Sequence, residues 1–275
     1  MAMKVGITGG SGNLGSSLIP CLLEHGHQVV VMDRALPASP IREAKYLRVD
    51  TRDYANLAEG LRGCDALVHL AAHRSPLQQP DTVVYNDNTT GSYNVLSAAA
   101  ALGISRVCLA SSANALGGTF SRRARYDYFP LDEDHPTYAD DPYSLSKWVL
   151  ECQADAFARR YLTMQVASLR FHWLMESRER AVSSTAQDGQ AAVKHLWSYT
   201  LLHEASRACL LALTADFAGH EVFFITAPRT AATKLSLDLA RDHYPMTKIL
   251  GDLGGHAAFH SSVKAERLLG WKHEP

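Results

Sequence analysis

Short apolar runs alternate along the chain with longer stretches in which apolar residues recur at helical spacing. The short runs are rich in valine, isoleucine and leucine, which favours buried strands. They lie at residues 5–7, 28–33, 46–49, 66–70, 106–110, 165–170 and 222–225. The helical stretches lie at 14–23, 88–102, 143–160, 203–212, 233–242 and 262–269. This alternation predicts an α/β fold built on a doubly wound parallel sheet of about seven strands.

The first strand leads directly into a glycine-rich turn, Thr8-Gly9-Gly10-Ser11-Gly12-Asn13-Leu14-Gly15, and then into a helix. The three spaced glycines, Gly9, Gly12 and Gly15, suit a tight turn, a close approach to a pyrophosphate and close packing of helix on strand. Free N–H groups at the start of the helix, with its dipole, bind phosphates. A second strand ends in Asp33, where dinucleotide-binding units of the Rossmann type carry an acidic residue.

The acidic residue favours NAD(H) over NADP(H). The carboxylate of Asp33 can accept both hydrogen bonds of a ribose diol, and it would repel a 2′-phosphate. Arg34 is the alternative signal, because an arginine here can stack on adenine or pair with that phosphate. Asp50, followed by Thr51 at the end of the third strand, could reach the adenine amino group or could cap the next helix.

The strict alternation lapses after Arg170, where a polar stretch follows at 176–190. We therefore expect residues 1–170 to form the dinucleotide-binding Rossmann domain. Residues 171–275 would form a small substrate-binding part, interleaved rather than independent, that folds over the carboxyl ends of the strands. Two aromatic residues of this part are expected in the core: Trp197 and Tyr199.

Composition and charge are those of a globular enzyme that works in the cytoplasm. Of 275 residues, 47% are hydrophobic and 20% charged, and the net charge of −1 offers no electrostatic footprint for nucleic acid or an anionic membrane. No apolar run reaches the roughly 18–20 residues that span a bilayer. The first strand begins too early for a signal peptide. Five scattered cysteines indicate reduced thiols, and the histidines form no metal-ligand cluster.

A second set of residues predicts proton transfer. Tyr143 and Lys147 lie four apart, on one face of the helix that Asp141 and Pro142 begin. A nearby ammonium favours the phenolate, so we expect Lys147 to lower the pKa of Tyr143 from about 10 toward neutrality. Ser112, at the end of the fifth strand, can hold the substrate oxygen. Hydride chemistry at a carbinol carbon needs such a set beside a nicotinamide.

These motifs together resemble the extended short-chain dehydrogenase/reductase superfamily over essentially the whole chain. The matching stretches are 8–15, Asp33, Asp50, 69–72, 88–92, 111–112, 143–147, 169–170 and 268–271. The resemblance implies an NAD(P)-dependent enzyme with a Ser112–Tyr143–Lys147 set and a bracing asparagine, Asn88. It also implies a homodimer formed through the helices at 88–102 and 143–160. The cofactor contacts expected from the motifs and the resemblance are Gly9, Gly12, Asn13, Leu14, Gly15, Asp33, Arg34, Asp50, Thr51, Leu70, Ala71, Ala72, Ala110, Tyr143 and Lys147.

One departure from the family bears on the substrate. Nucleotide-sugar epimerases and dehydratases of this superfamily usually carry an arginine-tyrosine-phenylalanine-asparagine run after the sixth strand. Here the run reads Arg170-Phe171-His172-Trp173, and the part that follows is short. We expect a small substrate such as a sugar, a sugar acid or a ketone, bound by strand-end loops and by a flap at 117–141. The candidate substrate contacts are His73, Arg74, Ser112, Asn114, His172 and Trp173.

The leading hypothesis is an NAD(P)-dependent oxidoreductase that acts on a small hydroxyl or carbonyl compound. The alternative is a sugar or nucleotide-sugar epimerase or dehydratase in which tightly bound NAD takes and returns the same hydride. A second alternative, from another class, is a regulatory protein that binds NAD(P) without turnover. Such proteins tend to lose the tyrosine or the lysine, and both are present here.

Overall fold

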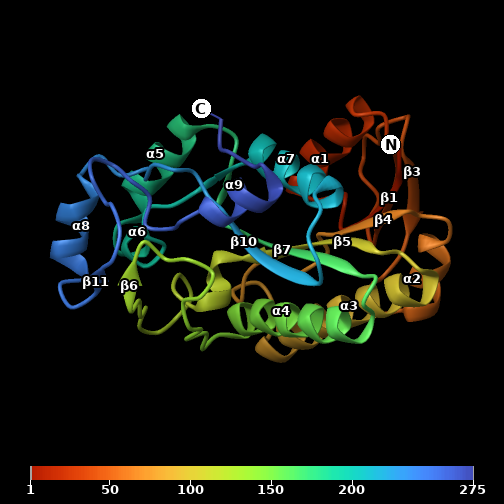
Figure 1. Cartoon of the computed structure of the whole chain (residues 1–275), viewed down its shortest axis with the longest axis horizontal. Helices are drawn as coiled ribbons and strands as arrows, with labels where there is room; N and C mark the ends of the chain where they lie inside the picture. The colour runs from red at the N-terminus through yellow and green to blue at the C-terminus, as the bar shows by residue number, and fades with distance from the viewer. Residues whose placement is uncertain (1, 275) are drawn as a thin grey trace.

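The structure is a computed structural model that describes residues 2–274. A seven-stranded parallel sheet forms the centre of the molecule (Figure 1). The strands follow the order β10-β7-β5-β4-β1-β2-β3, and every neighbouring pair is parallel. This confirms the predicted fold. The strands are β1 (Lys4–Thr8), β2 (Gln28–Asp33), β3 (Lys45–Arg48), β4 (Ala66–His69), β5 (Arg106–Ser112), β7 (Gln165–Phe171) and β10 (His220–Ile225).

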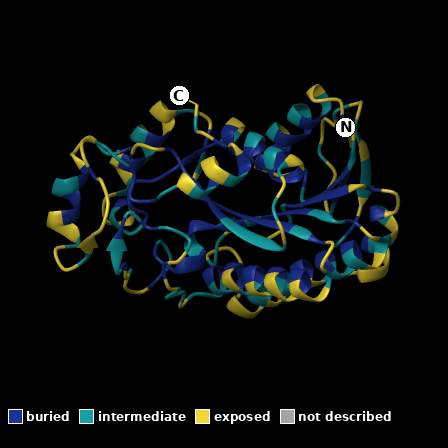
Figure 2. Ribbon diagram, viewed as in Figure 1, coloured by how far each residue is buried: buried dark blue, intermediate teal, exposed yellow. Residues whose placement is uncertain are grey.

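Helices cover both faces of this sheet, which is why its strands are apolar on both sides. Side chains alternate along β2: Val29 and Val31 join the core on one face, and Val30 and Met32 join the core on the other. Figure 2 shows the sheet buried between helices whose outer faces are exposed. One layer holds α1 (Asn13–Glu24), α7 (Leu202–Thr214) and α9 (Val263–Leu269), and the opposite layer holds α2 (Tyr54–Leu61), α3 (Asp81–Leu102) and α4 (Pro142–Arg160).

The order of the strands reverses between β1 and β4, because the chain moves outward from β1 to β3 and then returns to the other side of β1. In sheets of this type the ligand binds in the crevice at such a reversal, beyond the carboxyl ends of the strands. The glycine-rich turn follows β1 at this point, and residues 70–72 follow β4.

Two helices depart from the expected pattern. α3 begins at Asp81, about two turns before the expected start at residue 88. Pro80 precedes the helix, and the carboxylate of Asp81 lies in the first turn, where the helix dipole favours a negative charge. The polar residues 176–190 contain α5 (Arg178–Asp188), which Ser177 caps by accepting the N–H of Arg180. The α5 stretch is too polar to show an apolar stripe, and the apolar residues at the start of α3 are consecutive rather than at helical spacing.

The elements that lie outside the main sheet gather at one end of the molecule (Figure 1). Two short strand pairs lie there, as do helices from the last third of the chain. Trp197 and Tyr199 are buried, with 6% and 3% of their surface exposed, as predicted. The elements are η1 (Ala113–Leu116), β6 (Tyr128–Phe129), β8 (Leu174–Met175), α6 (Gln190–Lys194), β9 (Thr200–Leu201), α8 (Ser236–His243) and β11 (Lys248–Ile249).

Within residues 2–274, no helix combines the length and apolar character needed to cross a membrane.

Candidate active site

A single cavity of about 990 Å³ runs from the glycine-rich turn, past α4, to the junction of α5 and α6. It brings together residues at or just after the carboxyl ends of six strands of the main sheet: β1, β2, β3, β4, β5 and β7. Every site residue expected from the sequence lines it, except Gly15. Gly15 packs inside the turn, since a Cβ there would lie 2.0 Å from the carbonyl oxygen of Gly10, and its contact with a cofactor stays a prediction.

The glycine-rich turn has the shape of a phosphate cradle. Gly9 has a φ of +74°, and a Cβ there would lie 2.4 Å from the backbone nitrogen of Ala71. Gly12 is different, because a Cβ there would meet only the carbonyl oxygen of Gly9, at 3.3 Å. No side chain caps α1, so the N–H groups of its first turn remain available to a ligand. Gly12, Asn13 and Leu14 at this end of the helix line the cavity. These features fit a dinucleotide pyrophosphate.

Asp33 ties this turn to the sheet. Its carboxylate accepts the backbone N–H of Ser11 at 3.0 Å and that of Ala35 at 3.3 Å. Arg34 follows it along the same wall of the cavity. Asp33 therefore holds the loop that would cradle the phosphates, in addition to lying where a ribose diol would bind.

A chain of charged groups that the sequence did not reveal continues along this wall. Arg52 donates to both oxygens of Asp50, with NH2 at 2.6 Å from Oδ2, and its NH1 lies 3.0 Å from Asp87. Asp87 in turn lies 2.9 Å from Nε2 of His73. Hydrogen bonding to Arg52 lowers the pKa of Asp50. The reading of Asp50 as a helix cap is wrong, because Asp53 caps α2.

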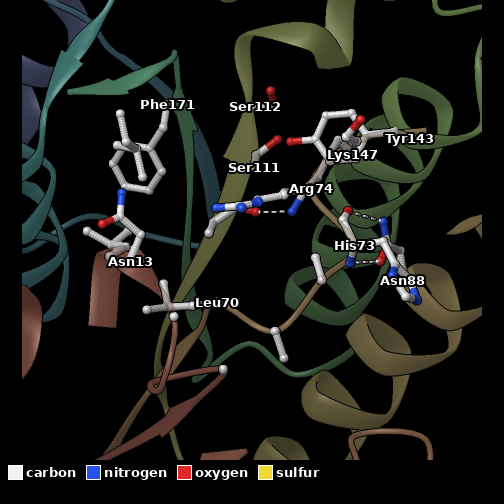
Figure 3. A pocket seen from close by; sticks show the side chains of 18 of the residues that line it. Asn13, Leu70, His73, Arg74, Asn88, Ser111, Ser112, Tyr143, Lys147 and Phe171 are labelled. Atoms are coloured by element: carbon white, nitrogen blue, oxygen red, sulfur yellow. Dashed lines mark hydrogen bonds between the residues drawn. The ribbon is translucent and has the colours of Figure 1, made fainter. Parts of the chain in front are cut away.

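Tyr143 and Lys147 extend from α4 into the middle of the cavity, and Figure 3 shows Arg74 beside them. The ammonium nitrogen of Lys147 donates to the carbonyl oxygen of Ala110 at 2.5 Å and lies 5.9 Å from the centre of the Tyr143 ring. Ser112 at the end of β5 lines the same part of the cavity and acts to lower the pKa of Tyr143. The structure thus brings the predicted serine, tyrosine and lysine together.

The expected effect of Lys147 on Tyr143 is wrong in this structure. Burial raises the pKa of Tyr143, while Ser112 acts in the lowering direction and Asp141 adds to the increase. Burial also lowers the pKa of Lys147 to about 8, against an opposing contribution from Glu151. Desolvation penalises the charged form of both groups, so the tyrosine holds its proton and the lysine titrates closest to neutrality.

Asn88 braces the loop after β4 against α4. Its Oδ1 accepts the N–H of His73 at 2.8 Å, and its Nδ2 donates to the carbonyl oxygen of His73 at 3.0 Å and to the hydroxyl of Ser146 at 2.9 Å (Figure 3). The amide is fully engaged by protein groups. Asn88 therefore positions the neighbouring residues.

A buried ion pair joins α4 to β7 next to this site. Arg170 donates to Glu151 through Nε at 2.9 Å and NH2 at 2.8 Å, and both side chains are 6% exposed. The hydroxyl of Ser111 donates to the same carboxylate at 2.6 Å. Ser111 is thereby occupied, which leaves Ser112 as the serine available to a ligand.

The far end of the cavity is built from the loop after β7 and from the α5–α6 junction. His172 and Trp173 line it as expected, and Asp188 and His195 join them. The rings of His172 and His195 lie 5.7 Å apart, and burial lowers the pKa of both. Asn114 also lines the cavity, where its Oδ1 accepts the N–H of Thr119 at 3.1 Å.

The backbone immediately after His195 is strained. Leu196 and Trp197 have φ values of 57° and 51°, in the left-handed region that costs a side-chain-bearing residue about 1–2 kcal/mol. Such strain concentrates at functional sites, where the surrounding structure holds it in place. No local signal predicts this strain, since neither residue is glycine, asparagine or aspartate.

The family model described as the NAD dependent epimerase/dehydratase family matches residues 5–187, which is most of the chain. The chain belongs to this family. It is thus an enzyme of the extended short-chain dehydrogenase/reductase type, as the sequence motifs predicted.

Several known proteins are similar to this family member. A UDP-glucose 4-epimerase from Corynebacterium glutamicum is 26% identical over 99% of this chain and 91% of its own length. An L-arabinose 1-dehydrogenase (NAD(P)(+)) from Haloferax volcanii is 29% identical over 70% of this chain and 76% of its own. Matches to some other relatives cover only about a third to a half of those proteins. The fold is also that of a UDP-glucose 4-epimerase structure from Thermotoga maritima, with a TM-score of 0.73, 21% identity and coverage of 99% and 94% of the two chains.

Proposed function

We propose that this enzyme transfers a hydride between NAD(H) and a small hydroxyl or carbonyl compound, such as a sugar, a sugar acid or a ketone. One observation carries the proposal: Ser112, Tyr143 and Lys147 meet in the same cavity as an uncapped helix N-terminus and a glycine-rich turn. The turn suits a dinucleotide, and the three side chains suit proton transfer at a carbinol oxygen.

Bound NAD would supply the hydride acceptor or donor; the protein would supply the proton chemistry. The hydroxyl of Ser112 holds the substrate oxygen by a hydrogen bond. In the reducing direction the phenol of Tyr143, which burial keeps protonated, donates its proton to that oxygen. In the oxidising direction the phenol must first lose its proton to solvent, so that the phenolate can accept the proton of the substrate hydroxyl. Lys147, anchored on the carbonyl oxygen of Ala110, holds a positive charge near the site below pH of about 8.

The distribution of charge supports a small substrate. A nucleoside diphosphate needs several cationic donors in fixed places. Of the basic residues in the C-terminal part, Lys194 donates to the carbonyl oxygen of Ser121 at 2.7 Å, and Arg207 pairs with Glu204 at 2.8 Å. Neither lines the cavity, whose far end carries the carboxylate of Asp188.

The finer choice of cofactor rests on Asp33. Its carboxylate lies at the end of β2 beside the glycine-rich turn, where it favours a ribose diol over a 2′-phosphate. Arg34 lines the same wall and is the group that would serve NADP(H). We propose NAD(H) as the preferred cofactor.

The family also suggests a homodimer, and we propose one built on α3 and α4. These helices pack side by side on one face of the sheet (Figure 1). Their solvent side carries Tyr93 and Trp148, with 51% and 39% of their surface exposed. Light scattering should give twice the chain mass, and Trp148→Glu should shift the population toward monomer.

A UDP-sugar epimerase is the second candidate, and the relative from Corynebacterium glutamicum favours it. The two functions differ in whether NADH accumulates, because an epimerase returns the hydride to the same substrate. They also differ in affinity for UDP. Micromolar binding of UDP by calorimetry, together with no net NADH, would favour the epimerase.

The test of the proposed function is Tyr143→Phe. It should abolish NADH production from a panel of sugars, sugar acids and alcohols while leaving the dissociation constant for NADH nearly unchanged, since the ring and helix remain. Tyr54→Phe, which removes a hydroxyl outside the cavity at the start of α2, is the matched control and should keep full activity. Retention of most activity by Tyr143→Phe would remove the proton-transfer assignment.

A further inference from the structure

Asp188 and His195 form a hydrogen-bonded pair at the far end of the cavity. Asp188 is the last residue of α5, Gly189 turns the chain with a φ of 51°, and His195 follows α6. This turn brings Nε2 of His195 to 3.2 Å from the carboxylate of Asp188. Both residues line the cavity, and the family model ends before His195.

The pair determines which nitrogen of His195 carries the proton. A carboxylate accepts hydrogen bonds, so Nε2 bears the hydrogen and Nδ1 keeps its lone pair. Nδ1 is buried and has no partner among residues 2–274, although the His195 side chain is only 5% exposed. A buried acceptor without a donor is costly and therefore uncommon in folded proteins. A ligand donor would satisfy it.

Two aromatic rings and the carboxylate of Asp188 lie beside the ring of His195. Trp173 packs on His195 with ring centres 5.5 Å apart, and His172 lies at 5.7 Å. Nδ1 of His172 is already engaged, because it accepts the N–H of Trp173 at 2.7 Å. Burial lowers the pKa of His195, which keeps its ring neutral and its acceptor available. Flat rings beside a neutral acceptor suit an uncharged hydroxyl on a carbon framework.

We propose that Nδ1 of His195 accepts a hydrogen bond from a substrate hydroxyl remote from the reacting carbon, and that Asp188 is a positioning residue that fixes the required tautomer. The ligand class at this end is a neutral polyhydroxylated chain or ring, as in an unphosphorylated sugar. The inference rests on the proposed function, which it deepens by naming the group that reads the substrate. The strained backbone at Leu196 and Trp197 follows His195 directly.

The first test is His195→Gln. A glutamine amide reaches the position of Nε2 and keeps a donor for Asp188, but it leaves no acceptor at the position of Nδ1. With D-galactose, L-arabinose and D-glucose as probes, we expect KM to rise by about tenfold to a hundredfold, while kcat changes by less than about threefold. The dissociation constant for NADH should stay unchanged. His203→Gln, at an exposed histidine on α7 outside the cavity, is the matched control.

Asp188 is tested by rescue. Asp188→Asn keeps an oxygen that accepts from Nε2, so KM should stay within about threefold of wild type. Asp188→Ala frees the ring to place its proton on Nδ1, and KM should rise nearly as far as in His195→Gln. A role in packing alone would move folding stability and the NADH affinity in Asp188→Ala, and would show no split between KM and kcat.

Deoxy sugars identify the hydroxyl. For the best of the three probes, one monodeoxy form should lose about the same factor in kcat/KM with wild type as His195→Gln loses with the intact sugar. The variant and the deoxy form together should lose no more than either alone, which is the signature of a shared contact. If the loss in kcat/KM caused by His195→Gln multiplies with the loss caused by the deoxy sugar for every monodeoxy form, the assignment is overturned.

Binding separates this inference from the proposed function. If no probe yields NADH, the proposed function is wrong, whereas an active Tyr143→Phe removes only the proton-transfer assignment. When no probe yields NADH, His195 is tested by calorimetric titration of the three sugars into the enzyme–NADH complex. Weaker sugar binding by His195→Gln than by wild type, by tenfold or more, supports the inference. Equal binding by the two proteins, or no binding of any of the three sugars by wild type, overturns it.

Discussion

The two ends of the cavity are built in different ways. At the glycine-rich turn the backbone forms the wall, and glycines permit contacts such as the one between Gly9 and Ala71. At the opposite end side chains such as His172, Trp173 and His195 form the wall, and the backbone that follows His195 is strained. The first end is shaped for a ligand common to a whole family, and the second is free to differ from one substrate to the next.

The difference teaches where each kind of ligand specificity is encoded. A backbone wall constrains residue type at fixed spacing, because only glycine fits where a Cβ would collide. A side-chain wall constrains only the positions of a few functional groups, and many different sequences can place such groups there. Substitutions at the first end should therefore act through fold and cofactor, and those at the second through substrate.

The largest expected effect is that of Gly15→Ala. Its Cβ would lie 2.0 Å from the carbonyl oxygen of Gly10, in backbone that cannot move aside cheaply. We expect a loss of more than about 3 kcal/mol in the free energy of unfolding, measured by urea denaturation, and loss of NADH binding. The control is Gly26→Ala, whose φ is +79° but whose Cβ would meet no atom within 4 Å. It should cost only about 1 kcal/mol.

The next largest effect is on folding stability and comes from Lys147, which lies in the middle of the cavity between its two ends. Burial lowers its pKa in the folded protein to about 8, from 10.5. Below pH of about 8 the ammonium is charged in both states, and the folded state bears the desolvation cost. Between about pH 8 and 10.5 the unfolded chain binds more protons, so stability rises with pH.

Lys147→Met should therefore raise the free energy of unfolding at pH 7 by about 1–3 kcal/mol, while it removes turnover. The gap between variant and wild type should narrow steadily from pH 8 to pH 10. Denaturation curves recorded across this range provide the measurement. A gap that is constant with pH would show that the lysine is not destabilised by its burial.

Gly12→Ala separates fold from cofactor at the backbone-built end. Gly12 is extended, with φ −82° and ψ 179°, and its Cβ would meet only an oxygen at 3.3 Å. We expect stability to change by less than about 1 kcal/mol. The dissociation constant for NADH should rise about tenfold or more, because the methyl group would occupy the space for the pyrophosphate. Unchanged NADH affinity would place the phosphates elsewhere.

Most of the fold could be predicted because two strong patterns agree. Strands buried on both faces, such as β2 and β4, appear as short apolar runs. Glycine spacing and the tyrosine–lysine interval of one helical turn then place the chemistry on those elements. The start of α3 could not be predicted, since its first apolar residues, Val83, Val84 and Tyr85, are consecutive and form no stripe at helical spacing.

The far end of the site could not be predicted for a physical reason. Asp188 and His195 meet only because Gly189 breaks the helix between them, and neither helix has a strong apolar face. The pKa of Tyr143 also depends on burial, which the spacing to Lys147 does not reveal. The role of Arg52 could not be predicted either, because its ion-pair partner Asp87 lies far away in the sequence.

The smallest expected effect is that of Asp33→Ala on cofactor choice, and it tests whether a side chain at the backbone-built end acts on the ligand or on the loop. Asp33→Asn keeps an oxygen for the N–H of Ser11 but removes the charge. If charge sets the preference, both variants should narrow the ratio of NADH to NADPH affinities by up to about tenfold. If the loop contact matters more, Asp33→Ala should weaken both cofactors equally and Asp33→Asn neither. Paired fluorescence titrations distinguish the two. Tighter binding of NADPH than NADH by the wild type would reject the proposed preference and assign cofactor recognition to Arg34.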